Sequence, residues 1–217
     1  MLDIKVINAA QQFLKDTFAD SLYLQKHPNE AAYRIEHSYR VANIAKQIAL
    51  NEGFCVTDAI VAGLLHDIAY CEEMPTWEQR KEHGRRGAEL VRPFLEEQGM
   101  SADRINEICY GIAIHVDDTS SFEWERTPFT ETVGDADNID RFDAYRIYET
   151  LQMQNFSDMS LNDKREKVVS TIEKLTEYKE MKLGTVTAKN LWLQRLDYYI
   201  GFYEKLKAQL DHSTAVL

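Results

Sequence analysis

The sequence predicts an all-α fold. Glycine and proline are scarce in the 217 residues, at 9 and 4, and most of them fall between segments in which apolar residues recur at three- and four-residue intervals. This interval is typical of helices that bury one face. We expect a single domain over residues 1–217, in which C-terminal packing helices occupy about residues 146–211.

The first third of the chain contains three predicted helices. An apolar stripe runs along residues 6–14, and a second helical segment begins at Pro28 and continues to Gly53. Thr57 followed by Asp58 is a plausible helix start, and the segment 59–69 is apolar enough on all sides to be buried.

The middle third contains three more. A loop around Pro75 precedes a helix expected from about Gly84 to Glu97, which Pro93 interrupts or begins. Ser101 opens the next helix, which leads to His115. Residues 116–128 form the longest polar, turn-rich interval, so we expect a loop there beside any site, followed by another helix.

Composition restricts the class of partner. The formal net charge of -11 argues against a basic surface for duplex nucleic acid, because neutralising phosphates requires clustered Lys and Arg. A small anionic substrate remains compatible if a metal supplies positive charge. A homo-oligomer is also compatible with the sequence.

The lack of a signal-peptide pattern and of paired cysteines predicts a cytoplasmic protein. The sequence start lacks the basic head and apolar block of a signal peptide, and no apolar run approaches the ~20 residues of a membrane span. The cysteines Cys55, Cys71 and Cys109 are odd in number and lack CxxC spacing. We therefore expect free thiols in a reducing compartment and no membrane association.

One dipeptide, His66-Asp67, carries the functional prediction. It lies at the end of the apolar segment, where an unpaired buried carboxylate would cost several kcal/mol and needs a partner or a metal. His37 precedes it, and His115 and Asp137 follow it. A lone histidine such as His37 is usually a surface or capping residue, so the order of the whole set carries the prediction.

Three motif blocks, at about residues 30–145, resemble the HD-domain superfamily of metal-dependent phosphohydrolases. They are HSYRVANIA around His37, AGLLHDIAY around His66 and VGDADNID around Asp137. The resemblance implies an HD-domain helical bundle whose metal ligands are His37, His66, Asp67 and Asp137. Spacing alone does not choose among the aspartates of the last block; the family pattern indicates Asp137, with Asp135 and Asp140 as caps or supporting partners.

Two further histidines bear on the number of metal ions. His83 begins HGRRGA and His115 ends GIAIH, and both blocks resemble positions that help bind a second metal in binuclear branches of the superfamily, with the aspartate corresponding to Asp67 as the bridge. In the mononuclear alternative, the two histidines touch only substrate or water. The donor set suits one or two ions of Mn, Fe, Co, Ni or Zn.

The resemblance implies hydrolysis of a nucleotide or another small phosphate ester, with Asp67 as the catalytic residue that orients or deprotonates the nucleophile. Substrate-binding residues are not assigned. Four cations lie near the motif blocks, but a solvated helix face is the favoured interpretation for each: Lys81, Arg85, Arg86 and Arg141.

Two alternatives stay open. The same six residues resemble the ligands of HD-fold di-iron oxygenases, although the lysines expected after the late histidine are absent, since Val116 and Asp117 follow His115. The iron content of the purified protein would distinguish a di-iron oxygenase from a phosphohydrolase. The other alternative is a non-catalytic module that binds a nucleotide without turning it over, which calorimetry and product analysis would identify.

Overall fold

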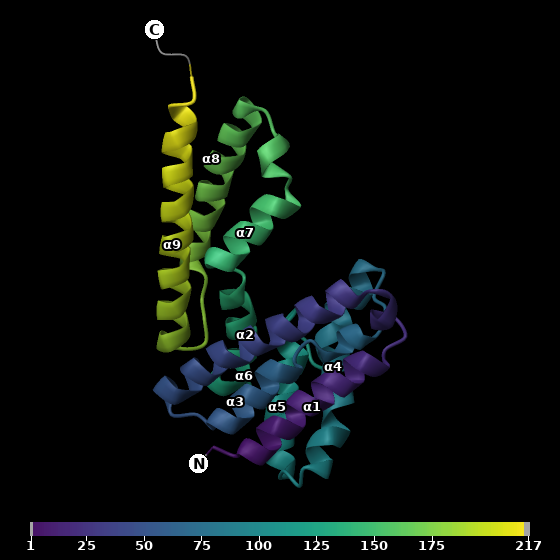
Figure 1. Ribbon diagram of the computed structural model, residues 1–217. Helices are drawn as coiled ribbons and strands as arrows, with labels where there is room; N and C mark the ends of the chain where they lie inside the picture. Colours follow the sequence, from purple (N-terminus) through teal and green to yellow (C-terminus); the bar gives the residue numbers. More distant parts are fainter. Residues whose placement is uncertain (1, 215–217) are drawn as a thin grey trace. The chain divides into compact units, whose positions relative to one another are not determined.

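The computed structural model describes residues 2–214, and every regular element in that range is a helix (Figure 1). The all-α prediction is confirmed. Contacts divide the chain into two compact units, Met1–Asn138 with Gly184–Ala188, and Ile139–Leu183 with Lys189–Leu217. The prediction of one domain stays a prediction. Across the described residues, no helix combines the length and apolar character needed to span a membrane.

The first unit contains the sequence blocks that predicted a site. Its elements are α1 (Ile4–Asp20), η1 (Leu24–Lys26), α2 (Pro28–Glu52), α3 (Val56–Leu65), η2 (Ile68–Cys71), α4 (Trp77–Glu97), α5 (Ala102–Ile114) and most of α6 (Pro128–Asp140).

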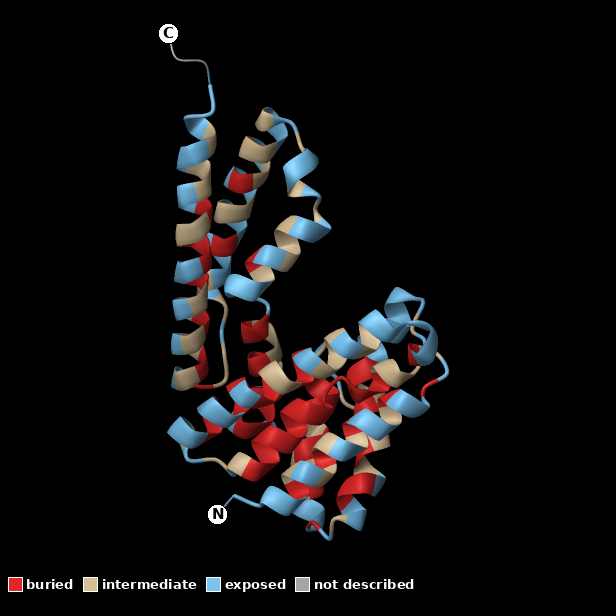
Figure 2. Cartoon of the chain, viewed as in Figure 1, coloured by how far each residue is buried: buried red, intermediate tan, exposed pale blue. Residues whose placement is uncertain are grey.

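Helix α3 is the centre of this unit, and every residue in it after Val56 is buried (Figure 2). It packs against α1, α2 and α5. Burying a side chain such as Leu65 contributes roughly 1.5–3 kcal/mol. The one carboxylate in α3, Asp58, is buried but accepts two hydrogen bonds from Arg104 of α5, at 2.6 and 3.0 Å. The apolar segment is therefore the buried helix that its composition predicted.

Helix α4 begins earlier than the sequence predicted. Its first residue is Trp77, not Gly84, because Thr76 and Gln79 form a capping box in which each side chain binds the other residue's backbone N–H. Pro93 lies inside the helix and neither begins nor ends it. The predicted loop around Pro75 is correspondingly shorter.

The second unit contains α7 (Ala144–Met153), η3 (Phe156–Asp158), α8 (Leu161–Glu177), η4 (Tyr178–Glu180) and α9 (Val186–Asp211) from Lys189 onward. Its core is aromatic: the rings of Phe142 and Trp192 meet edge to face at 4.9 Å, and the indole N–H of Trp192 donates to the carbonyl of Tyr178 at 2.8 Å. These are the packing helices expected in the C-terminal third.

Candidate metal centre

Helices α2 and α3 cross closely enough to place His37 beside His66. Gly63 permits this approach, since a Cβ atom there would lie 2.8 Å from the Cα of Ala42. The two Nε2 atoms are 3.2 Å apart, and both histidines are buried. A glycine at the crossing thus brings two residues that are distant in sequence into one pair.

A second crossing, between α4 and α5, pairs His83 with His115. Here Gly84 permits the approach, because a Cβ atom on it would lie 2.7 Å from the carbonyl oxygen of Ala113. The Nε2 atoms of the two histidines are 3.0 Å apart. His115 follows the last residue of α5 directly, as His66 follows the last residue of α3.

The carboxylate of Asp67 lies between the two histidine pairs. Its Oδ1 is 3.0 Å from Nε2 of His83, 3.7 Å from that of His115 and 3.6 Å from that of His66. Its Oδ2 is 3.6 Å from Nε2 of His37. Two groups of side chains close enough to hold a metal ion result, and Asp67 belongs to both.

Asp137, on α6, joins the first of these groups. Its Oδ1 is 3.1 Å from Nε2 of His37 and 4.0 Å from Nε2 of His66. The structure therefore brings all six predicted residues into one cluster. Asp135 does not belong to this cluster. It is buried, and its carboxylate accepts a hydrogen bond from the backbone N–H of Gly184 at 2.9 Å.

The orientation of three imidazoles suits a cation or a shared proton between their Nε2 atoms. The Nδ1 atoms of His66, His83 and His115 lie 2.9, 2.5 and 2.6 Å from backbone carbonyl oxygens. A carbonyl only accepts hydrogen bonds, so each Nδ1 carries a proton, and each ring, when it is neutral, presents its Nε2 lone pair to the cluster. The lone pairs of His83 and His115 would then repel each other across 3.0 Å unless a positive charge lies between them.

The ionisation of His66 and Asp67 fits a divalent cation, whereas for His115 the lowering of the pKa by burial is outweighed by contact with Asp67, which raises this pKa above its usual value. Burial lowers the pKa of His66 to about 4, which keeps this ring neutral. Burial acts to raise the pKa of Asp67, but the interactions with His66, His115, His83 and Arg34 outweigh it and hold that pKa well below its usual value. A neutral imidazole and an ionised carboxylate are the forms that bind a divalent metal.

Arg34 and Tyr70 contact the cluster and were missed by the sequence analysis. Arg34 Nη1 donates to Asp67 Oδ2 at 2.9 Å, and its guanidinium carbon lies 3.4 Å from the centre of the Tyr70 ring. The Tyr70 ring is in turn 4.7 Å from that of His83. Spacing offered a signal, because Arg34 precedes His37 by one helical turn.

Other cations near the motif blocks have different partners. Arg85 donates to Asp117 at 2.8 Å, Arg86 binds Glu72 at 2.6 Å, and the Lys81 ammonium lies 5.6 Å from the Trp77 ring. Lys81 is exposed and the side chain of Arg86 is 42% exposed, in agreement with a solvated face, whereas that of Arg85 is only 19% exposed.

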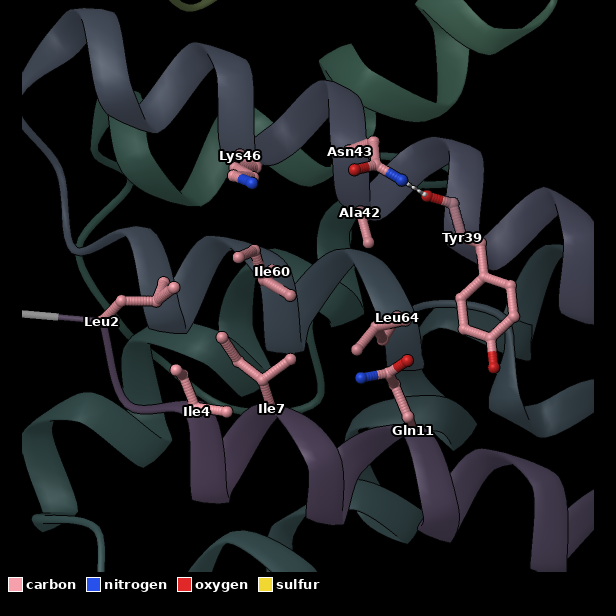
Figure 3. A pocket seen from close by; sticks show the side chains of 10 residues that line it. All are labelled: Leu2, Ile4, Ile7, Gln11, Tyr39, Ala42, Asn43, Lys46, Ile60 and Leu64. Atoms are coloured by element: carbon pink, nitrogen blue, oxygen red, sulfur yellow. Dashed lines mark hydrogen bonds between the residues drawn. The ribbon is translucent and has the colours of Figure 1, made fainter.

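An apolar cavity of about 280 Å³ lies between α1, α2 and α3 (Figure 3). Ile7, Ile60 and Leu64 contribute to its wall, and Lys46 and Asn43 lie at its polar side. None of the six clustered residues lines it. The cavity in Figure 3 is therefore separate from the candidate metal centre.

Comparison with known proteins agrees with this arrangement. The family model described as HD domain matches residues 34–145. A predicted HD superfamily hydrolase from an uncultured Thermotogales bacterium has a similar structure, with a TM-score of 0.61, 23% identity and coverage of 94% of this chain and 91% of that one. A Lactobacillus plantarum protein gives a TM-score of 0.57 at 19% identity, covering 98% and 100%. No curated protein matches the chain.

Proposed function

Because this chain belongs to the HD domain family, we propose that it is a metal-dependent phosphohydrolase acting on a nucleotide or another small phosphate ester. The observation that carries the proposal is the convergence of histidine Nε2 atoms and the Asp67 carboxylate. The predicted HD superfamily hydrolase with a similar structure supports the reaction class.

The residues that would hold the metal form two sets. His37, His66, Asp67 and Asp137 would hold one ion, while His83 and His115 with the shared Asp67 would hold a second. Manganese, iron, cobalt, nickel and zinc all suit imidazole and carboxylate donors. When bound, such an ion supplies Lewis-acid chemistry, activating water at neutral pH and neutralising charge that develops on the phosphoryl oxygens.

The chain's own residues would position the reaction. Asp67 is the residue placed to orient the attacking water and to accept its proton, because it lies within 4 Å of all four histidines. Arg34 donates to the opposite oxygen of the same carboxylate and so fixes its orientation. The rings of His66, His83 and His115 are each held by a hydrogen bond between Nδ1 and a backbone carbonyl. These bonds limit the movement of the histidines.

The test is a screen of purified protein loaded with manganese or cobalt against nucleoside mono- and triphosphates and sugar phosphates. We expect phosphate release that requires both metal and Asp67, with Asp67→Asn lowering the rate by at least the 10²- to 10³-fold typical of removing one group that stabilises the transition state. Asp103→Asn, at an exposed position of α5, is the matched control. Hydrolysis that is unchanged in Asp67→Asn would contradict the proposal.

The di-iron oxygenase alternative rests on the same observation, since its six ligands are the six residues of this cluster. Protein produced in iron-rich medium separates the two functions. Two irons per chain, an oxygen-sensitive visible spectrum and no phosphate release would favour the oxygenase.

A further inference from the structure

A pocket of about 380 Å³ lies within the second unit and is lined by residues of α7, α8 and α9 and of the segment before α7 (Figure 1). Its volume is within the range typical of sites for small ligands. All of its lining residues belong to the second unit, whereas the six residues of the metal cluster belong to the first. The pocket therefore shares no residue with the metal centre.

Aromatic rings form the apolar wall of this pocket. Phe142 and Tyr199 line it and are buried, and their rings meet edge to face at 5.7 Å. The ring of Tyr178, which is 37% exposed, lies 6.1 Å from that of Phe142. Aromatic side chains of this kind pack well against another flat ring, so this wall suits an aromatic group.

A polar face of α8 forms another wall. Lys167, Thr171 and Lys174 lie at positions i, i+4 and i+7, so they share one side of the helix, and Ser170 lies next to them. A helix side that is turned toward neighbouring helices usually carries apolar residues that fill the space between them. Here the side chains at these positions present ammonium and hydroxyl groups to the pocket instead.

The charges around the pocket favour an anion. No carboxylate lines it, and neither Lys167 nor Lys174 forms an ion pair with any residue that the structure describes. The carboxyl ends of α7 and α8 border the pocket at Gln154 and Tyr178. Each helix end contributes only about half a negative charge, whereas each ammonium carries a full positive charge. In a chain with a net charge of -11, this pocket is consequently a local site of positive potential.

We propose that the pocket binds a small aromatic anion, with its ring against the three aromatic side chains and its phosphate or carboxylate group bound by Lys167 and Lys174. The lysine stems are flexible, so both ammonium groups can reach one anion, and the Gln154 amide lines the same pocket as a further donor. No histidine, cysteine or carboxylate lines the pocket, which suits binding without hydrolysis. The inference does not depend on the proposed phosphohydrolase function.

The first test measures binding of phenylphosphonate, which has no hydrolysable ester bond, to the full chain by isothermal titration calorimetry in EDTA. We expect one site per chain. Inorganic phosphate, which has no ring to stack, and benzyl alcohol, which has no charge, should each bind at least about tenfold more weakly. No binding of phenylphosphonate, or equal binding of either comparison compound, would overturn the inference.

Substitutions then locate the bound probe. Lys167→Gln and Lys174→Gln should each weaken phenylphosphonate binding by about three- to tenfold, because each removes a hydrogen bond from a charged donor. Both lysines are at least partly exposed, so the fold should be unaffected. Tyr178→Leu should weaken binding of phenylphosphonate but not of inorganic phosphate. Lys205→Gln, at an exposed position of α9 outside the pocket, is the matched control. Unchanged affinity in all three pocket variants, or an equal loss in Lys205→Gln, would contradict the assignment.

Benzoate distinguishes the two kinds of anionic group. Tighter binding of phenylphosphonate would identify a phosphate group on the ligand, and tighter binding of benzoate a carboxylate; either result supports the aromatic anion. These measurements need neither metal nor turnover. Binding that depends on Lys167 without hydrolysis of any phosphate ester would therefore keep this site and remove the proposed function, and hydrolysis without such binding would do the reverse.

Discussion

The Nε2 atoms of His83 and His115 face each other at 3.0 Å while the Nδ1 atom of each ring contacts a backbone carbonyl. Both rings therefore present lone pairs to the same point. The arrangement is stable with a cation or a shared proton between them, and the nearby Asp67 carboxylate favours either. Whether a second metal ion binds can therefore be tested by substituting one residue of this pair.

Metal content should respond to this pair. We expect two divalent ions per chain by elemental analysis of protein loaded with manganese or cobalt, and one ion in His83→Gln, because the first set of ligands does not include His83. His212→Gln, in the exposed polar tail, should still bind two. A stoichiometry of one in the unsubstituted protein, unchanged in His83→Gln, would instead support the mononuclear site.

The close helix crossing at Gly84 should tolerate no side chain. Gly84→Ala would place a methyl group within 2.8 Å of two carbonyl oxygens of α5, so we expect a loss of about 1–3 kcal/mol in the free energy of unfolding and weaker binding of the second ion. Gly201→Ala is the matched control, because no atom lies within 4 Å of its Cβ position. In helix α9 this change should stabilise by up to about 1 kcal/mol. Urea denaturation measures the free energy of unfolding of both variants. An equal change in Gly84→Ala and Gly201→Ala would contradict the packing argument.

The capping box at the start of α4 should be measurable in the same assay. Thr76→Ala removes the side-chain acceptor for the N–H of Gln79, and we expect a loss of about 1 kcal/mol. Thr76→Ser keeps the hydroxyl and should lose far less. If alanine and serine behaved alike, the hydroxyl would not be the stabilising group.

Thiol reactivity should differ among the three cysteines. Burial raises the pKa of Cys71 and of Cys109 to about 11, whereas Cys55 is exposed. Only the thiolate reacts, so at pH 8 a thiol reagent should label one cysteine fast and two slowly. Below the raised pKa, the labelling rates of Cys71 and Cys109 should rise about tenfold per pH unit, because the fraction of each thiol present as thiolate rises about tenfold. Cys55→Ser should abolish the fast phase; a fast phase that persists would contradict the assignment.

The sequence predicted which histidines and aspartates cluster better than it predicted their surroundings. The order of His37, His66-Asp67 and Asp137 identified residues that the structure brings together, because the motif blocks also contain a helix end before His66 and the helix crossing at Gly63. The predicted start of α4 was wrong, because the capping box of Thr76 and Gln79 begins the helix at Trp77, within the polar segment after Pro75. Arg34 was missed because a charged residue on a helix usually faces solvent; its position one turn before His37 is a weak signal, and its contact with Asp67 reveals another role.

Helices α3 and α5 both end immediately before a histidine of the cluster, so their carboxyl-terminal dipoles add negative potential there. Each end favours a nearby cation by typically ~0.3–1 kcal/mol and disfavours an anion by a comparable amount. With Asp67 and Asp137 in the same place and, among the described residues, only the Arg34 cation paired with Asp67, we expect the centre to bind phosphate weakly until an ion is present. Binding should accordingly follow a compulsory order in which the ion enters first and the phosphorylated ligand second.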